Sequence, residues 1–164
     1  MPSSLKTIAF GSEVFPARQL ALWRKYVPNA RYINLYGPTE ATGMSCYYVV
    51  DREFKEDEVI PIGRPFPNTG ILLLNEDGKE VTQGEKGEIC IRGTAVTMGY
   101  YRQPEKTAGN FVQNPLNKDY PEIIYKTGDL GYYNDRGELM LLPVRIIRLN
   151  IWDIVLNLVK LKAV

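Results

Sequence analysis

Residues 31–40 read RYINLYGPTE, a short run suited to a β-strand that stops at Gly37-Pro38. Aliphatic side chains alternate along this run with polar or aromatic ones, which is the two-residue period of a strand. Upstream, Leu5–Phe10 is a second short apolar run, and Pro16–Val27 carries apolar residues at helical spacing. We therefore predict strand, helix and strand over residues 5–36, forming one α/β unit with parallel strands.

The downstream part of the chain has a different character, because turn residues rather than helices separate its strand-like runs. These runs are Cys46–Val50, Gly70–Leu74, Gly87–Arg92 and Leu139–Leu142. Tight hairpin turns are predicted at Glu76–Lys79 and Asn134–Gly137, and a helical turn at Pro104–Gly109. The predicted fold class is an α/β part followed by a β-rich, barrel-like part, with subdomains at residues 1–50 and 51–142.

Composition excludes several classes of function. The 164 residues suffice for one compact domain, and 20 Lys and Arg against 19 Asp and Glu give a net charge of +1, which attracts neither nucleic acid nor a membrane surface. The absence of histidine removes Ser-His-Asp and Cys-His catalysis and His-ligated zinc. Cys46 and Cys90 lack metal-binding spacing and are expected to be buried thiols. With no leader or long apolar run, we expect a cytoplasmic location.

The segment Asn34–Glu40 gathers polar groups where a strand ends, which is where ligands bind in open α/β sheets. Tyr36 can stack on a planar base, Asn34 can bond the edge of that base, and Thr39 can donate to a phosphate oxygen. Glu40 can supply a hard oxygen ligand to Mg2+. The segment therefore suits a magnesium nucleotide, and the alternative is an ordinary Gly-Pro turn followed by a solvated Glu.

A second polar segment, Tyr125–Leu130, reads YKTGDL and is expected at another strand end. The two carboxylate oxygens of Asp129 can accept both hydroxyls of a ribose. The alternative is a Thr-Gly-Asp turn in which Asp129 satisfies backbone donors. A third segment, Gly87–Tyr101, predicts only β-structure.

The order of several motifs resembles the adenylate-forming ligase superfamily. The matching segments are GSE from Gly11, NLYGPTEAT from Asn34, GEICIRG from Gly87, MGYYRQPEKT from Met98 and YKTGDLGYYNDRGEL from Tyr125. The YGPTE form is most similar to amino-acid adenylation domains of nonribosomal peptide synthetases and to D-alanine–carrier protein ligases. The resemblance covers Leu5–Leu142 and implies a central fragment of the family's large N-terminal domain.

The resemblance also implies roles for individual residues. Tyr36 would stack on adenine beside Asn34, and Asp129 would hold the ribose hydroxyls, so these segments are expected to converge on one nucleotide. Thr39 would touch the α-phosphate and Glu40 would bind Mg2+, which makes this pair the expected catalytic residues. The implied nucleotide-binding set is Asn34, Tyr36, Gly37, Thr39 and Asp129, and the residues implied to face the amino-acid side chain are Phe10, Leu35, Gly43 and Met44. Lys126 receives no role, because a surface lysine accounts for it.

The implied reaction joins a carboxylate to the α-phosphorus of ATP, releases pyrophosphate and passes the acyl group to the phosphopantetheine thiol of a carrier protein. A carboxylate is already a nucleophile, so the missing histidine agrees with this chemistry. An amino-acid substrate, ATP or AMP, Mg2+ and an acyl or peptidyl carrier protein are the implied ligands and partners. An acyl-CoA synthetase fragment and a non-catalytic interaction module remain open alternatives.

Two expectations concern the ends of the chain. The family's lysine-containing phosphate loop and its ammonium-binding aspartate are expected upstream of Gly11, and its catalytic lysine downstream, so the chain alone is expected to be inactive. In the tail, residues 143–164, codons shifted by one nucleotide can spell RKDYQIKHMGHSIELGEIE, so we interpret the tail as frameshifted. The alternative is an amphipathic docking helix that carries Ile151, Ile154, Val155, Leu158 and Val159.

Overall fold

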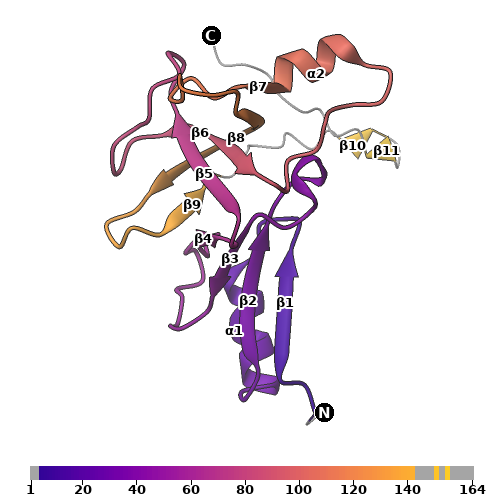
Figure 1. Ribbon diagram of the computed structural model, residues 1–164. Coiled ribbons are helices and arrows are strands. Elements are labelled where there is room, and N and C mark those ends of the chain that lie inside the picture. Colours follow the sequence, from indigo (N-terminus) through magenta and orange to yellow (C-terminus); the bar gives the residue numbers. More distant parts are fainter. Residues whose placement is uncertain (1–3, 143–149, 152–153, 156–164) are drawn as a thin grey trace.

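The computed structural model describes residues 4–142, 150–151 and 154–155. Its N-terminal part is the predicted strand-helix-strand unit, made of β1 (Thr7–Gly11), α1 (Ala17–Tyr26) and β2 (Arg31–Tyr36) (Figure 1). β1 and β2 pair in parallel. The α/β prediction is therefore confirmed, with each element boundary within two residues of the expected one.

The sheet that β1 and β2 begin is a mixed sheet. β3 (Cys46–Val49) pairs antiparallel with β2, and the two-residue β4 (Arg64–Pro65) pairs antiparallel with β3, which gives the order β1-β2-β3-β4. The sequence pattern did not predict β4, because a two-residue strand that contains proline has no alternation to detect. With β4 the first sheet extends to Pro65. The subdomain division at residue 50 stays a prediction.

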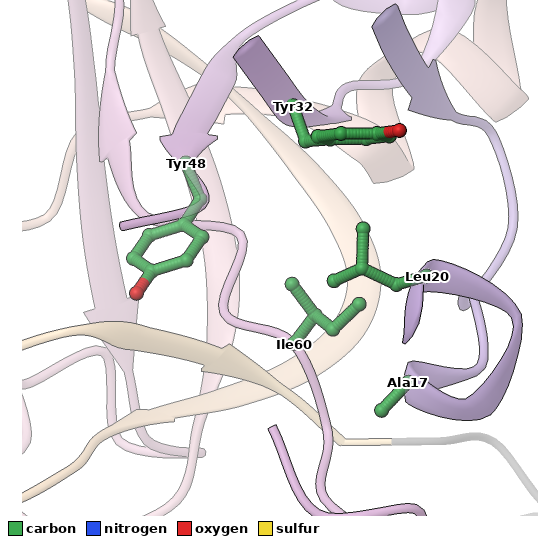
Figure 2. Packing of buried hydrophobic residues seen from close by; sticks show 5 residues of the cluster. All are labelled: Ala17, Leu20, Tyr32, Tyr48 and Ile60. Atoms are coloured by element: carbon green, nitrogen blue, oxygen red, sulfur yellow. The ribbon is translucent and has the colours of Figure 1, made fainter. Parts of the chain in front are cut away.

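A buried cluster beneath α1 holds the helix against the sheet (Figure 2). Ala17 and Leu20 project from α1 toward Tyr32 of β2 and Ile60, and both helical side chains are 2% exposed. The Tyr32 hydroxyl donates to the Val27 carbonyl at 3.0 Å, so this buried phenol is satisfied at the helix end. This packing fixes the position of β2 relative to α1.

The C-terminal part is a five-stranded antiparallel sheet, as predicted for a β-rich half (Figure 1). Its strands are β5 (Thr69–Leu74), β6 (Gly87–Gly93), β7 (Phe111–Gln113), β8 (Ile123–Tyr133) and β9 (Leu139–Leu141). They lie in the order β5-β6-β8-β7, with β9 paired to β8. The helix α2 (Pro104–Asn110) precedes β7. This arrangement confirms the predicted fold class.

The two predicted hairpin turns differ in the strand pairing that they support. Asn134–Gly137 joins β8 to β9, with Gly137 at φ 70, and is a complete hairpin. Glu76–Lys79 is also a turn, with Gly78 at φ 74, but beyond it the chain forms only an isolated bridge between Leu74 and Glu80. The principal partner of β5 is β6.

The structure corrects the expected location of the Tyr125–Leu130 segment. The segment lies inside the eleven-residue β8 and not at a strand end. The pairing of β8 with β6 shifts register between Glu88 and Cys90, and Gly128 adopts φ 74. A bulge of this kind lets a strand continue while one side chain is re-aimed, and its residues resemble those of a turn.

A second buried cluster joins the two sheets. Cys46 of β3 packs with Leu73, Ile89 and Leu139 of the second sheet, and all four are at most 1% exposed. The Ile62 amide also donates to the Leu139 carbonyl at 2.9 Å. Both cysteines are buried free thiols, and burial raises the pKa of each to about 12. This shared core holds the C-terminal end of β2 against the second sheet.

The tail interpretation falls largely outside the described residues. Of residues 143–164, the structure describes only two short antiparallel strands, β10 (Asn150–Ile151) and β11 (Ile154–Val155). Three residues of the alternative docking helix, Ile151, Ile154 and Val155, therefore lie in strands, while Leu158 and Val159 lie outside the described residues. Across the described part of the chain, every helix is too short or too polar to cross a bilayer.

Gly63 offers a test of the junction between the sheets. It adopts φ 79, and a Cβ there would overlap the backbone carbonyl oxygen of Tyr47. We expect Gly63→Ala to lower the free energy of unfolding by about 1–2 kcal/mol for the left-handed backbone and by about 1–3 kcal/mol more for the overlap. Gly84→Ala is the matched control, because Gly84 adopts φ 83 with open space around it. Equal losses for the two variants in urea denaturation would contradict this account.

Candidate functional site

The site begins where β2 leaves the sheet and turns sharply. Tyr36 ends the strand, and a single 3-10 turn, η1 (Thr39–Ala41), follows Pro38. The Ser45 amide donates back to the Tyr36 carbonyl at 2.8 Å and closes the loop. A Cβ on Gly37 would lie 2.5 Å from the Ser45 nitrogen, so only glycine fits at this position.

Two hydrogen bonds tie this loop to the segment after β6. The Thr42 hydroxyl donates to the Ala95 carbonyl at 2.7 Å, and the Thr97 amide donates to the Glu40 carbonyl at 2.9 Å. Glu40 is therefore held at its backbone by a segment more than fifty residues away. The loop after β2 is fixed from both sides.

Tyr36 and Asp129 meet across the two sheets. The Tyr36 hydroxyl donates to Asp129 Oδ2 at 2.8 Å, although the two residues are 93 positions apart. Burial raises the pKa of the Tyr36 phenol well above its ordinary value, and the nearby Asp129 charge raises it further. The phenol therefore stays protonated and keeps donating. The two residues were expected to converge on one nucleotide. The hydrogen bond shows that their side chains lie side by side, and the shared nucleotide stays a prediction.

The bulge in β8 presents the Asp129 carboxylate. The Thr127 hydroxyl donates to the Ile89 carbonyl at 2.7 Å and accepts from the Asp129 amide at 3.0 Å. The Gly128 amide donates to Glu88 Oε1 at 2.9 Å. The neighbouring backbone donors are thus occupied by Thr127 and Glu88, so Asp129 is not the acceptor of a simple turn.

Lys126 lies beside the bulge and forms an ion pair with Glu88, with Nζ 3.2 Å from Oε2. Its side chain is 42% exposed. This contact agrees with the surface lysine expected from the sequence, and it gives the side chain a local partner.

Glu40 is held by a tyrosine that the sequence motifs did not single out. The Tyr100 hydroxyl donates to Glu40 Oε1 at 2.6 Å, and the Tyr125 hydroxyl lies 3.4 Å from that of Tyr100. Partial burial raises the pKa of the Glu40 carboxyl, but the Tyr100 hydrogen bond and the charge of Lys106 help to lower it, and the net shift is downward. Glu40 is therefore ionised at neutral pH and accepts hydrogen bonds or binds a cation.

Tyr100 and Lys106 belong to MGYYRQPEKT, a segment that the sequence connected with secondary structure and the family resemblance but with no residue role. The sequence feature that could have drawn attention to Tyr100 is the pair Tyr100-Tyr101 just before a helix that begins at Pro104. Nothing in the spacing of the sequence connects Tyr100 to Glu40, which lies 60 positions away. Tyr125 likewise contributed only as part of a strand-like motif.

Asn34 and Thr39 occupy different environments. Asn34 is 6% exposed, and its Nδ2 donates to the Pro61 carbonyl at 2.9 Å. Its amide NH2 group therefore already has a structural partner, and its role at an adenine edge stays a prediction. Thr39 is exposed at the start of η1, where a ligand can reach its hydroxyl.

The four residues expected to face a substrate side chain do not form one cluster. The Phe10 ring lies 4.3 Å from the Phe15 ring and packs against the core beneath α1. Leu35 follows Asn34 on β2 and points to the opposite face of the sheet, whereas Phe10 pairs with Asn34 and shares its face. Gly43 and the half-exposed Met44 lie in the loop after η1. Their common pocket stays a prediction.

A bound nucleotide would supply part of the coordination of a metal ion at this site. Within the described residues there is no group of three His, Cys, Asp or Glu side chains able to hold a metal ion. Mg2+, however, is commonly bound by one or two carboxylates together with substrate phosphates and water. The ionised, partly exposed Glu40 fits this mode of binding.

Comparisons with known proteins agree with this geometry. The family model described as AMP-binding enzyme matches residues 1–101. Bacitracin synthase 1 of Bacillus licheniformis is 37% identical over 137 residues, which cover 84% of this chain and 3% of that protein. Delta-poly-L-ornithine synthetase of Acinetobacter baumannii is 34% identical over 137 residues, covering 83% of this chain and 10% of that protein. The chain therefore spans a small part of the length of the curated relatives it matches.

A solved structure shares the same architecture. Holo-PA1221, described as a nonribosomal peptide synthetase protein containing adenylation and carrier (PCP) domains bound to a vinylsulfonamide inhibitor, superposes with a TM-score of 0.78. The two are 30% identical, and the match covers 84% of this chain and 24% of that one. The fold described above is thus that of an adenylation-domain segment.

The half-buried Tyr36 side chain predicts a pH dependence of stability. Folding raises the pKa of this phenol. Its contribution to the free energy of unfolding is therefore complete below the ordinary tyrosine pKa of 10.0 and is lost as the pH rises above that value. Each tyrosine that stays protonated in the folded state makes the free energy of unfolding fall by about 1.4 kcal/mol per pH unit in this range. We expect Tyr36→Phe to reduce the steepness of the loss above pH 10 by about that amount, measured by urea denaturation.

The control for this experiment is Tyr101→Phe, because Tyr101 is 83% exposed. This variant should follow the wild-type pH profile. A Tyr36→Phe profile parallel to that of the wild type would contradict the assignment.

Proposed function

The chain belongs to the AMP-binding enzyme family, and on that premise we propose that it carries the adenosine-binding part of an amino-acid adenylation site. The observation that supports this most directly is the 2.8 Å hydrogen bond between the Tyr36 hydroxyl and Asp129. It sets an aromatic ring and a carboxylate side by side, as recognition of a base and its ribose requires.

In the proposed complex the adenine ring stacks on Tyr36 and the ribose hydroxyls donate to Asp129. An ionised carboxylate offers about four acceptor positions on its two oxygens. The Tyr36 hydroxyl uses one position on Oδ2, so a ribose diol can be accepted without breaking that bond. The phenol thereby keeps the carboxylate aligned while the sugar binds.

Thr39 and Glu40 are proposed to act on the phosphates. The exposed Thr39 hydroxyl donates to an oxygen of the α-phosphate, and Glu40 is the residue that would hold Mg2+. When bound, Mg2+ neutralises phosphate charge and makes pyrophosphate a better leaving group. Gly37 completes the set, because its lack of a side chain lets the loop close behind Tyr36.

The proposed reaction is attack of an amino-acid carboxylate on the α-phosphorus of ATP. A bond forms from the carboxylate oxygen to phosphorus, the bond to the bridging oxygen breaks, and pyrophosphate leaves with the electron pair. The phosphopantetheine thiol of a carrier protein then gives up its proton and attacks the carbonyl carbon of the aminoacyl adenylate. A thioester bond forms, the bond from that carbon to the phosphate oxygen breaks, and AMP leaves with the electron pair. Similarity to peptide synthetases and to a structure with adenylation and carrier domains supports this assignment, and with it a cytoplasmic location.

Replacement of Asp129 tests the ribose-binding role. We expect Asp129→Ala to weaken AMP binding by about 10- to 100-fold, because hydrogen bonds to a charged acceptor are lost. Isothermal titration calorimetry of the purified 164-residue chain with AMP measures this directly. Asp135→Ala, at the exposed turn between β8 and β9, is the matched control. Equal AMP affinity in wild type and Asp129→Ala would reject the assignment.

We further propose that the 164-residue chain binds nucleotide without turning it over. The charge of Lys106 helps to lower the pKa of Glu40, but stabilising a departing pyrophosphate requires stronger charge compensation than one such cation supplies. Amino-acid-dependent ATP/pyrophosphate exchange should therefore stay at background when all twenty amino acids are supplied. Exchange above background that Glu40→Gln abolishes would overturn this expectation.

A further inference from the structure

Tyr100 contacts the proposed metal ligand but has no role in the chemistry described so far. Its hydroxyl donates to Glu40 Oε1 at 2.6 Å, a short bond typical of a hydroxyl that donates to a charged oxygen. Glu40 comes from the loop after β2, whereas Tyr100 precedes α2 in the second half of the chain. The bond therefore fixes a side chain that the η1 backbone alone leaves free to rotate.

Several contacts hold Tyr100 itself in place. Its backbone amide donates to Thr107 Oγ1 at 2.9 Å, and its ring packs edge-on against Phe111 at 5.6 Å. Lys106 Nζ lies 4.0 Å from the centre of the Tyr100 ring, within the range of a cation–π contact. A Cβ on Gly99 would overlap Thr107, so glycine is required for α2 to approach this closely. The helix α2 thus delivers a rigid hydroxyl to Glu40.

We propose that Tyr100 is a positioning residue that orients the Glu40 carboxylate toward the Mg2+ carried by a nucleoside triphosphate. This inference rests on the proposed role of Glu40 as the metal ligand. The Tyr100 bond occupies only part of the acceptor capacity of the carboxylate, so a cation can share it. Removing a residue that hydrogen-bonds a metal ligand, without itself touching the metal, typically weakens metal binding about 10- to 100-fold.

The opposite possibility is that Tyr100 competes with the cation. A donor that only blocks the carboxylate would make metal binding tighter once the hydroxyl is removed. The two ideas therefore predict opposite signs for the same substitution, Tyr100→Phe. The rigid support of Tyr100 by Thr107, Phe111 and Lys106 favours positioning, because a fixed donor preorganises the carboxylate.

The experiment compares two kinds of binding to the purified 164-residue chain. Calorimetry with AMP in the absence of metal reports the Tyr36–Asp129 site. ATP affinity measured at increasing Mg2+ concentration tests the role of Glu40 as the metal ligand. Loss of the free Mn2+ signal in electron paramagnetic resonance measures how much metal is bound to the ATP complex. We expect Tyr100→Phe to raise the Mg2+ concentration for half-maximal ATP binding by about tenfold and to leave AMP affinity unchanged.

Two further variants complete the design. Tyr101→Phe removes the adjacent, 83% exposed hydroxyl and should match the wild type. Thr107→Val removes the acceptor that holds the Tyr100 amide and should shift the Mg2+ midpoint in the same direction, which provides a second route if Tyr100→Phe folds poorly. Thermal unfolding is recorded for each variant.

The inference is overturned if Tyr100→Phe keeps the wild-type Mg2+ midpoint, binds metal more tightly, or weakens AMP and ATP equally, the last outcome indicating a purely structural role. It is also overturned if wild-type ATP affinity does not respond to Mg2+. Failure of the wild type to bind AMP without metal would instead reject the proposed function, and the inference with it. A selective shift of the Mg2+ midpoint supports it.

Discussion

The hydrogen bond from Tyr36 to Asp129 is the contact on which the rest of the site depends, because it joins the first sheet to the second. It sits beside a core to which β3, β5, β6 and β9 each contribute a buried side chain. That apolar packing fixes how the sheets meet, and the half-buried Tyr36 phenol packed against it requires an acceptor. The carboxylate of Asp129 satisfies this requirement, so one contact both stabilises the junction and orients the carboxylate that we propose to bind ribose.

Two glycines allow the backbone geometry that positions Tyr36 and Asp129 for this contact. Gly37 lets the chain double back after β2 where any side chain would collide with Ser45, and Gly128 takes a positive φ within the bulge of β8. Each departure from regular geometry lies next to the residue of this contact that it orients, Tyr36 or Asp129. Bulges and tight turns cluster at binding sites because they re-aim side chains while the surrounding sheet stays intact.

The sequence predicted the elements whose evidence is local. The strand-helix-strand unit and the hairpin at Asn134–Gly137 follow from periodicity and turn residues. The sequence predicts a strand end where the structure has the bulge in β8, because Thr-Gly-Asp is typical of a turn and only the pairing with β6 shows that the strand continues. Contacts between distant segments, such as Tyr100 with Glu40, leave no trace in spacing, since tertiary packing alone determines them. For the same reason the sequence could not reveal that Phe10 and Leu35 point to opposite faces of one sheet.

The two carboxylates of the candidate site are held reciprocally. Asp129 belongs to the second sheet and receives its hydrogen bond from Tyr36 of the first. Glu40 lies in the loop between β2 and β3 of the first sheet and receives its bond from Tyr100 of the second half. Each half therefore presents one carboxylate and orients the carboxylate of the other. Neither half alone can hold both groups in place. Binding of any ligand that engages both carboxylates is therefore thermodynamically linked to docking of the two sheets, and such a ligand stabilises the junction between them.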